Sequence, residues 1–202
     1  DGRSIVRLKR QAQKEVYTKV QMVFQDAVGS FNPRRKIGES ISDTLCRLCG
    51  EKKHTAGKEA ARLLEDVGLP GDYAEKYPHE LSGGQLQRVC IARAVACEPQ
   101  LILFDEAISS LDAHTQVQVM DLLMELKDQL GLTYVFITHD LTSVTYLCDQ
   151  VLFLYKGKIT EHIPVEKIAE TSDPYAKKLL DSIIEFDEEY DNESDAGQER
   201  SA

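Results

Sequence analysis

Short apolar runs that end in polar residues, separated by segments with helical periodicity, constrain the fold of this 202-residue chain most strongly. Residues 101–105 form one such run, and two acidic residues follow it. Residues 133–138 form a β-branched, nearly continuous apolar run, which is typical of a strand in a parallel sheet covered on both faces. Residues 19–24 alternate between polar and apolar residues like a further strand. Strands that alternate with helices predict an α/β fold with a parallel, right-handed core.

The spacing of apolar residues predicts helices around these strands. They are expected at 37–48, 58–67, about 73–77, 82–97, 112–130 and about 174–184. A further helix is expected after His139-Asp140 and should run to Cys148. Ser82 and Asp112 are suitable N-caps, and Gly131 is a suitable C-cap. A hairpin is expected over 151–161. The helical block 37–97 lies between two strands, so we expect it to be an inserted subdomain.

Composition limits the kinds of partner. The formal net charge of −10 argues against a nucleic-acid surface, and no apolar run is long enough to span a membrane. Residues 185–202 hold eight acids and one base, which predicts a disordered, solvating tail. The five cysteines are scattered and odd in number, as expected for free thiols in a reducing compartment. Cys46-x-x-Cys49 lies in a helical stretch, where two ordinary helix residues are expected rather than a metal or redox site.

Two acids follow the strand 101–105. A carboxylate at the carboxyl end of a buried parallel strand lies in the crevice where α/β proteins bind ligands. Asp105 could hold Mg²⁺, and Glu106 could polarise or deprotonate an attacking water; phosphoryl transfer needs both tasks. Taken alone, the pair could equally be two solvated acids at a strand end.

Three further features of the sequence could also take part in phosphoryl transfer. Ser82-Gly83-Gly84-Gln85 begins a helix, and free N–H groups at a helix start accept phosphate. His139 follows the strand 133–138 and could hydrogen-bond a phosphate. Gln25 ends the strand 19–24 and could contact the attacking water or the metal shell. Alone, each of these residues is more often structural.

In this order, the motifs resemble the nucleotide-binding domain of ATP-binding-cassette ATPases over about residues 1–184. The resemblance implies a P-loop-NTPase-like (RecA-like) parallel sheet core with an inserted helical signature subdomain. It identifies the Q-loop at Gln25, the signature at Leu81–Gln85, Walker B at Leu101–Glu106, the D-loop at Ser109–Asp112 and the switch histidine at His139.

The resemblance also implies roles for these residues. The catalytic set would be Glu106, His139 and Gln25, and the metal ligands would be Asp105 and Gln25. The nucleotide-binding residues would be Ser82, Gly83, Gly84, Gln85 and Asp112. ATP and Mg²⁺ are the implied cofactors. In this family, two domains sandwich two ATP molecules, and each site pairs one domain's Walker A and Walker B with the other domain's signature.

The segment organisation implied by the resemblance has four parts. Residues 1–25 would be the remnant of an N-terminal lobe that ends in the Q-loop, and residues 26–97 the helical subdomain. Residues 98–184 would be the RecA-like core, followed by the acidic tail 185–202. No G-x-x-x-x-G-K-S/T loop occurs in the sequence, although that loop is the usual nucleotide cradle. We therefore expect an N-terminally truncated chain that binds ATP poorly and hydrolyses none alone.

Flanking motifs resemble the ATPases of peptide and nickel importers. They are Phe24-Gln25-Asp26, Tyr77-Pro78-His79-Glu80 and Asp173-Pro174-Tyr175. Ala27 stands where many peptide-type members have Pro, so the choice between peptide and metal stays open. The resemblance implies an ATP-hydrolysing subunit on the cytoplasmic face of a bacterial-type membrane. Its partners would be a second ATP-binding subunit, two membrane-spanning permease subunits and, indirectly, a substrate-binding protein, with no nucleic acid.

Two other functions are considered. A soluble ATPase of DNA repair or chromosome structure is disfavoured, because residues 26–80 contain neither a long coiled coil nor a zinc insert. The other alternative is a truncated regulatory subunit that donates its signature motif to a partner's ATP site and hydrolyses none itself. The presence of Glu106 and His139 weighs against that alternative.

Overall fold

The computed structural model describes residues 4–181. The described residues fall into two compact units, 4–140 and 141–181. The predicted tail 185–202 and the end of the last predicted helix lie outside the described residues. The segment boundaries that the sequence suggests after Gln25 and Cys97 stay predictions. No helix within 4–181 combines the length and the apolar character needed to cross a membrane.

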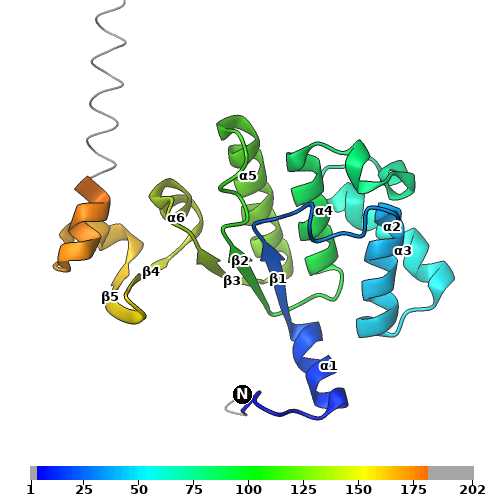
Figure 1. Cartoon of the computed structure of the whole chain (residues 1–202), viewed down its shortest axis with the longest axis horizontal. Helices are drawn as coiled ribbons and strands as arrows, with labels where there is room; N and C mark the ends of the chain where they lie inside the picture. The colour runs from blue at the N-terminus through cyan, green and yellow to red at the C-terminus, as the bar shows by residue number, and fades with distance from the viewer. Residues whose placement is uncertain (1–3, 182–202) are drawn as a thin grey trace, which may run out of the picture. The chain divides into compact units, whose positions relative to one another are not determined.

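A parallel three-stranded sheet forms the centre of the first unit (Figure 1). Its strands are β1 (Val20–Phe24), β2 (Leu101–Asp105) and β3 (Thr133–Ile137), in the order β1-β2-β3. Both pairs of neighbours are parallel. The three predicted strands and the predicted α/β class are confirmed.

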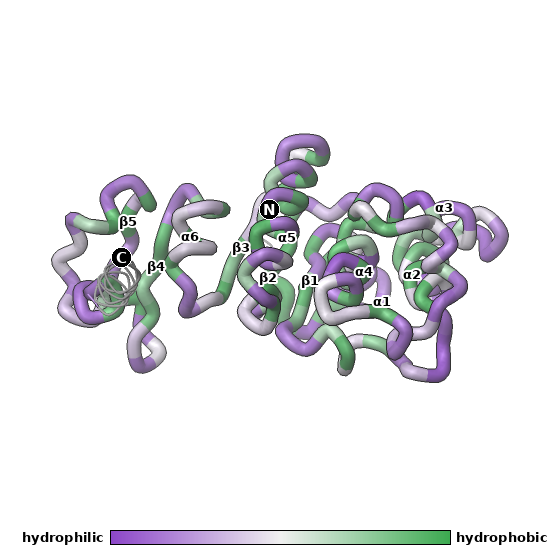
Figure 2. Tube along the Cα trace, turned by 90° about the horizontal axis from the view of Figure 1, so that it is seen from above, coloured by the Kyte–Doolittle hydropathy of each residue, from purple (hydrophilic) through white to green (hydrophobic). Residues whose placement is uncertain are grey.

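One face of this sheet is buried. Val23, Ile102 and Phe104 are almost fully buried, and Figure 2 shows the strands as largely hydrophobic. The Phe104 ring stacks on Phe136 with the ring centroids 4.5 Å apart. Helix α5 (Ala113–Leu130) covers this face, and the Tyr134 hydroxyl donates to its Leu123 carbonyl at 2.9 Å. Burial raises the pKa of Tyr134 above its usual value, so this donor stays protonated.

The opposite face differs from the prediction. Val20, Phe24, Val135 and Ile137 are between 40% and 49% exposed. Alternate residues of a strand point to opposite faces, and these four share one face through the register of the three strands. The prediction that both faces are covered is therefore wrong for the described residues. A β-branched apolar run does not reveal which of its faces another element covers.

Within residues 4–140, the first unit contains seven helical elements besides α5. They are α1 (Arg10–Lys19), α2 (Ile37–Thr44), η1 (Leu45–Cys49), α3 (Lys53–Asp66), η2 (Gly71–Glu75), η3 (Pro78–Glu80) and α4 (Gly83–Val95). Helices α2 and α3 contact each other, and Ile37, Ile41 and Leu64 on them are buried. The predicted helix 37–48 is split into α2 and a π-helical turn. Helix α1 was not predicted, because it buries no residue and so has no apolar stripe.

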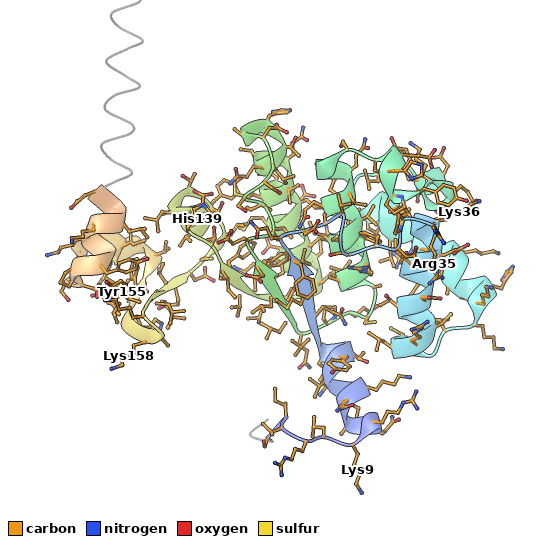
Figure 3. All side chains as sticks on the ribbon, in the orientation of Figure 1. Lys9, Arg35, Lys36, His139, Tyr155 and Lys158 are labelled. Atoms are coloured by element: carbon orange, nitrogen blue, oxygen red, sulfur yellow. The ribbon has the colours of Figure 1, made fainter. Side chains whose placement is uncertain are left out.

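The second unit contains a short helix and a hairpin. Its elements are α6 (Leu141–Leu147), β4 (Gln150–Tyr155), β5 (Lys158–Pro164), η4 (Val165–Glu170) and a helix over 174–181. Strands β4 and β5 are antiparallel, and Tyr155 and Lys158 flank their turn (Figure 3). Lys156 and Gly157 both have positive φ, 48° and 77°, as a tight hairpin turn requires. The predicted hairpin is confirmed.

Candidate functional site

The three strands of the central sheet end at one edge. Phe24 lies opposite Asp105, and Asp105 lies opposite Ile137. Gln25 and Glu106 follow their strands directly, and His139 follows β3 two residues after its end (Figure 3). The parallel register therefore brings together side chains that are far apart in the sequence.

Glu106 is hydrogen-bonded on both carboxylate oxygens. Gln25 Nε2 donates to Oε2 at 3.1 Å, and His139 Nδ1 lies 3.4 Å from Oε1. The side chains of His139 and Glu106 are 70% and 34% exposed, so the network is open to solvent and to a ligand. Two neighbouring strands thus hold the Glu106 carboxylate from opposite sides.

The backbone of Glu106 has an uncommon conformation. Its φ is +47°, in the left-handed region that residues other than glycine rarely adopt. Its N–H donates to the Ile137 carbonyl at 2.8 Å, and its own carbonyl accepts from Ser109 Oγ at 2.9 Å. Such strain persists where the surrounding structure imposes it, and it is common at functional sites.

Asp105 has a different environment from Glu106. It lies in register with Phe24 and Ile137 on the exposed face of the sheet, and it is half-buried. Within residues 4–181, its carboxylate forms no hydrogen bond or ion pair. These oxygens are therefore available to an incoming cation or water.

The start of α4 is fixed by its own sequence. The Ser82 hydroxyl accepts from the Gln85 N–H at 3.3 Å, and the Gln85 side chain accepts from the Ser82 N–H at 3.0 Å. This reciprocal pair is a capping box, and it confirms Ser82 as the N-cap. Unsatisfied N–H groups and the positive end of the helix dipole favour an anion at such a start.

The two glycines in this motif have different surroundings. A Cβ placed on Gly83 would have no atom within 4 Å, whereas a Cβ on Gly84 would collide with the Thr115 side chain of α5. Gly83 therefore leaves space for a ligand to approach the backbone. Gly84 instead allows α4 and α5 to pack closely.

A cleft of about 780 Å³ lies beside the start of α4. Ser82 and Gln85 line it together with Arg88, whose guanidinium donates to the Val67 carbonyl at 3.1 Å. Its other charged groups are acidic: Glu65, Asp66, Asp121 and Glu125. These acids repel an anion, so the groups suited to phosphate are confined to the α4 start.

Asp112 caps α5. Its carboxylate accepts from the Thr115 N–H at 3.0 Å, which confirms the predicted N-cap. Hydrogen bonds from Thr115 hold the pKa of Asp112 below its usual value. Its suggested part in nucleotide binding stays a prediction.

The structure brings together some of the predicted site residues but not others. Gln25, Glu106 and His139 form one network, while the α4 start is separate, and within 4–181 no hydrogen bond or ion pair joins the two sets. Sequence reasoning missed Thr115, which meets Gly84. The spacing Asp112-x-x-Thr115, typical of a capped first turn, could have indicated its position but not its contact with α4.

Comparison with known proteins gives a consistent result. The family model described as "ABC transporter" matches residues 1–109. The chain is 43% identical to the oligopeptide transport ATP-binding protein OppF of Bacillus subtilis over 92% of the chain and 61% of that protein. It is 46% identical to the nickel import ATP-binding protein NikE of Rhodospirillum rubrum over 82% of the chain and 60% of that protein. The chain thus spans about three fifths of the length of each of these two relatives.

A solved structure is similar as well. It is a dimer of the ATP-binding cassette MJ0796 in a post-hydrolysis state, bound to ADP and Pi. The TM-score is 0.65 at 27% identity, and the match covers 79% of this chain and 68% of that one. The predicted fold class is confirmed at this level.

Proposed function

The chain belongs to the ABC transporter family, and from that premise we propose that it provides the ATP-hydrolysing residues of a bacterial-type importer. The proposed cargo is a peptide, nickel or another metal ion, since similar proteins are named for peptide and nickel transport. The observation that supports this proposal best is the network of Gln25, Glu106 and His139 across three strand ends.

The residues present suit ATP with Mg²⁺. Mg²⁺ prefers oxygen ligands and is usually bound through one or two carboxylates together with substrate phosphates and water. Among residues 4–181 there is no group of three or more His, Cys, Asp or Glu that could hold a metal ion. We therefore propose that Asp105 and Gln25 contact Mg²⁺ that arrives with the nucleotide. When bound, Mg²⁺ neutralises charge on the phosphate oxygens.

The proposed chemistry of this chain centres on Glu106. Its carboxylate orients a water molecule and accepts its proton, as a general base does. Gln25 Nε2 holds Oε2 and His139 Nδ1 holds Oε1, so the carboxylate is fixed before the substrate binds. The imidazole has a second ring nitrogen, Nε2, which this contact leaves unused. We propose that Nε2 hydrogen-bonds a phosphate oxygen.

The start of α4 has a separate proposed role. Its N–H groups, the Ser82 hydroxyl and the open space at Gly83 suit a phosphate. Because no bond links this set to the strand-end network, we propose that it serves a second nucleotide, held mainly by a partner subunit. The dimeric state of the similar solved structure supports a two-subunit arrangement.

The proposed assembly follows from the family. The chain would pair with a second ATP-binding subunit, a second copy or a different chain, and dock on two permease subunits at the cytoplasmic membrane face. A substrate-binding protein would take part indirectly. Residues 26–97 would form the helical signature subdomain, and 98–184 the core. We also propose that the 202-residue chain alone hydrolyses no ATP, because it contains no G-x-x-x-x-G-K-S/T loop.

The test is reconstitution of the natural gene product with its permease subunits in lipid vesicles. We expect ATP hydrolysis together with ATP-dependent uptake of an oligopeptide or of nickel. ATP binding without hydrolysis by this subunit would instead favour the truncated regulatory subunit. The absence of both activities would contradict the proposal.

A further inference from the structure

Two cysteines far apart in the sequence meet in the first unit. Cys49 ends the π-helical turn η1, and Cys97 follows the end of α4. Their Sγ atoms are 2.7 Å apart, across 48 positions of sequence. A disulfide has an S–S distance of about 2.05 Å. A small side-chain movement would therefore bring the two sulfur atoms within bonding distance.

The two thiols differ in exposure. Cys49 is exposed, whereas Cys97 is 7% exposed. Burial, and after it the Cys49 neighbour, raise the pKa of Cys97, while the charge of Lys14 acts in the opposite direction. Cys49 is therefore the thiol that a dissolved oxidant can reach, and Cys97 is placed directly behind it. An exposed cysteine beside a second cysteine that can resolve it is typical of redox-sensing sites.

We propose that Cys49 and Cys97 form a reversible disulfide when the protein meets a hydroperoxide, which makes the pair a redox-modification site. This inference does not depend on the proposed function. Cys49 and Cys97 are both free cysteines in the structure, so the resting pair is a dithiol.

The chemistry balances in two steps. Cys49 Sγ attacks one oxygen of the hydroperoxide, the O–O bond breaks, and Cys49 becomes a sulfenic acid while the peroxide is reduced to water or an alcohol. Cys97 Sγ then attacks Cys49 Sγ, and the departing hydroxide leaves as water with the Cys97 proton. Overall, two thiols lose two electrons and two protons to the peroxide. A dithiol reductant reverses the change by thiol–disulfide exchange.

The bond would join two parts of the first unit. Cys49 belongs to the helical group of α2 and α3, while Cys97 lies between α4 and β2. The N–H of Gln100, three residues after Cys97, donates to the carbonyl of Lys19, the last residue of α1 before β1. A disulfide would therefore tie the end of η1 to the chain that leads into the sheet. Because it would close a long loop, it would restrict the unfolded chain and stabilise the folded one.

The other cysteines provide internal comparisons. Cys90 is 2% exposed, and burial raises its pKa to about 11, so it should stay a thiol. Cys46 lies three residues before Cys49 and is half-buried. Cys148 lies in the second unit. A specific reaction of Cys49 with Cys97 is therefore distinguishable from general oxidation.

The test is peptide mapping after mild oxidation. The reduced, purified protein is treated with hydrogen peroxide, alkylated with iodoacetamide and digested with trypsin without reductant. Cleavage after Arg47 and Arg93 puts every cysteine on a different peptide. We expect one cross-linked pair, residues 48–52 with residues 94–127, which dithiothreitol separates. Independent oxidation of the two cysteines, or a dominant link that involves Cys46, would overturn the proposal.

Variants separate this reaction from a loss of folding. Cys46→Ser should still cross-link, whereas Cys49→Ser should leave Cys97 alkylatable after peroxide. Because Cys49 is exposed, its serine variant should keep the circular dichroism spectrum of the parent. Oxidation should raise the Tm of the parent by roughly 5 °C or more and leave that of Cys49→Ser unchanged. Equal shifts in both proteins would contradict a Cys49–Cys97 bond.

Discussion

The strand-end network and the start of α4 are built in opposite ways. The network joins Gln25 to Glu106 across 81 positions and Glu106 to His139 across 33 positions, and its geometry comes from the register of three parallel strands. The α4 start needs only Ser82–Gln85 and the hydrogen bonds among them. One site is a product of the whole sheet, and the other is a local property of the chain.

The difference indicates how each region can fail. A one-residue slip of any strand would turn its side chains to the opposite face and would dismantle the network. The α4 start would survive such a slip, because its capping box is local. Substitutions in the network should therefore change the rate of ATP hydrolysis. At the α4 start, some substitutions should change contact with the ligand and others should change the packing of the helix.

The largest expected effect belongs to the network. Glu106→Gln keeps the size of the side chain but removes the proton acceptor. In the natural gene product, we expect ATP hydrolysis to fall by roughly 100-fold or more, with nucleotide binding retained. Phosphate release and binding of a fluorescent ATP analogue measure the two properties. Glu51→Gln, an exposed acid on another segment, is the matched control and should hydrolyse normally; equal rates for both variants would disprove the role of Glu106.

The second prediction distinguishes the effect of side-chain charge from that of side-chain size at the start of α4. Gly83→Asp puts a negative charge where a phosphate is proposed, although an acid at a helix N-terminus favours the helix itself. We expect ATP hydrolysis by the dimer to fall roughly tenfold with no loss of Tm. Gly83→Ala adds a methyl group to open space and should have little effect. Full activity of Gly83→Asp would mean that no anion binds there.

The third prediction concerns the packing of α4 on α5. Gly84→Val would force its side chain against Thr115, and overpacking of this kind costs about 1–3 kcal/mol of unfolding free energy. Urea unfolding followed by circular dichroism measures the loss. Adding Thr115→Ala removes the opposing methyl group, so the double variant should recover most of the stability. Additive losses would show that the two residues do not meet.

The smallest expected effect is a pH dependence at Asp112. Its folded pKa is lowered by the bonds from Thr115, so the stability that it contributes is present above its unfolded pKa of about 3.9. That contribution is lost as the pH falls through the folded pKa. Asp112→Asn keeps a good N-cap without this titration. Its unfolding free energy should fall less than that of the parent between neutral pH and pH 3, and identical pH profiles would contradict the role of the cap.

Much of the fold could be predicted from the sequence because the relevant signals are local. Apolar runs marked β1, β2 and β3, and Ser82, Asp112 and Gly131 marked helix ends. Helix α1 escaped prediction because it lacks an apolar stripe. The exposed sheet face escaped because the sequence of a strand does not say what covers it.

The site was predictable as a set of residues but not as an arrangement. Motif order indicated Gln25, Glu106 and His139, yet the positive φ of Glu106 and its two hydrogen bonds depend on register. The two glycines of the signature look alike in sequence, although only Gly84 is constrained by Thr115. The contact of Cys49 with Cys97 spans elements whose packing no short motif encodes.

The most direct test of the two-region interpretation uses dimers with one substituted and one unsubstituted ATP-binding subunit, purified through two different tags. Glu106→Gln and Gly83→Asp are placed singly or together in the substituted subunit, and ATP hydrolysis is measured. If the two regions act on different nucleotides, each single variant damages one site and the double variant damages both. We therefore expect the doubly substituted dimer to be far less active than either singly substituted dimer. Equal activity of the double variant and the Glu106→Gln dimer would mean that both regions act on one nucleotide, which would contradict the separation proposed here.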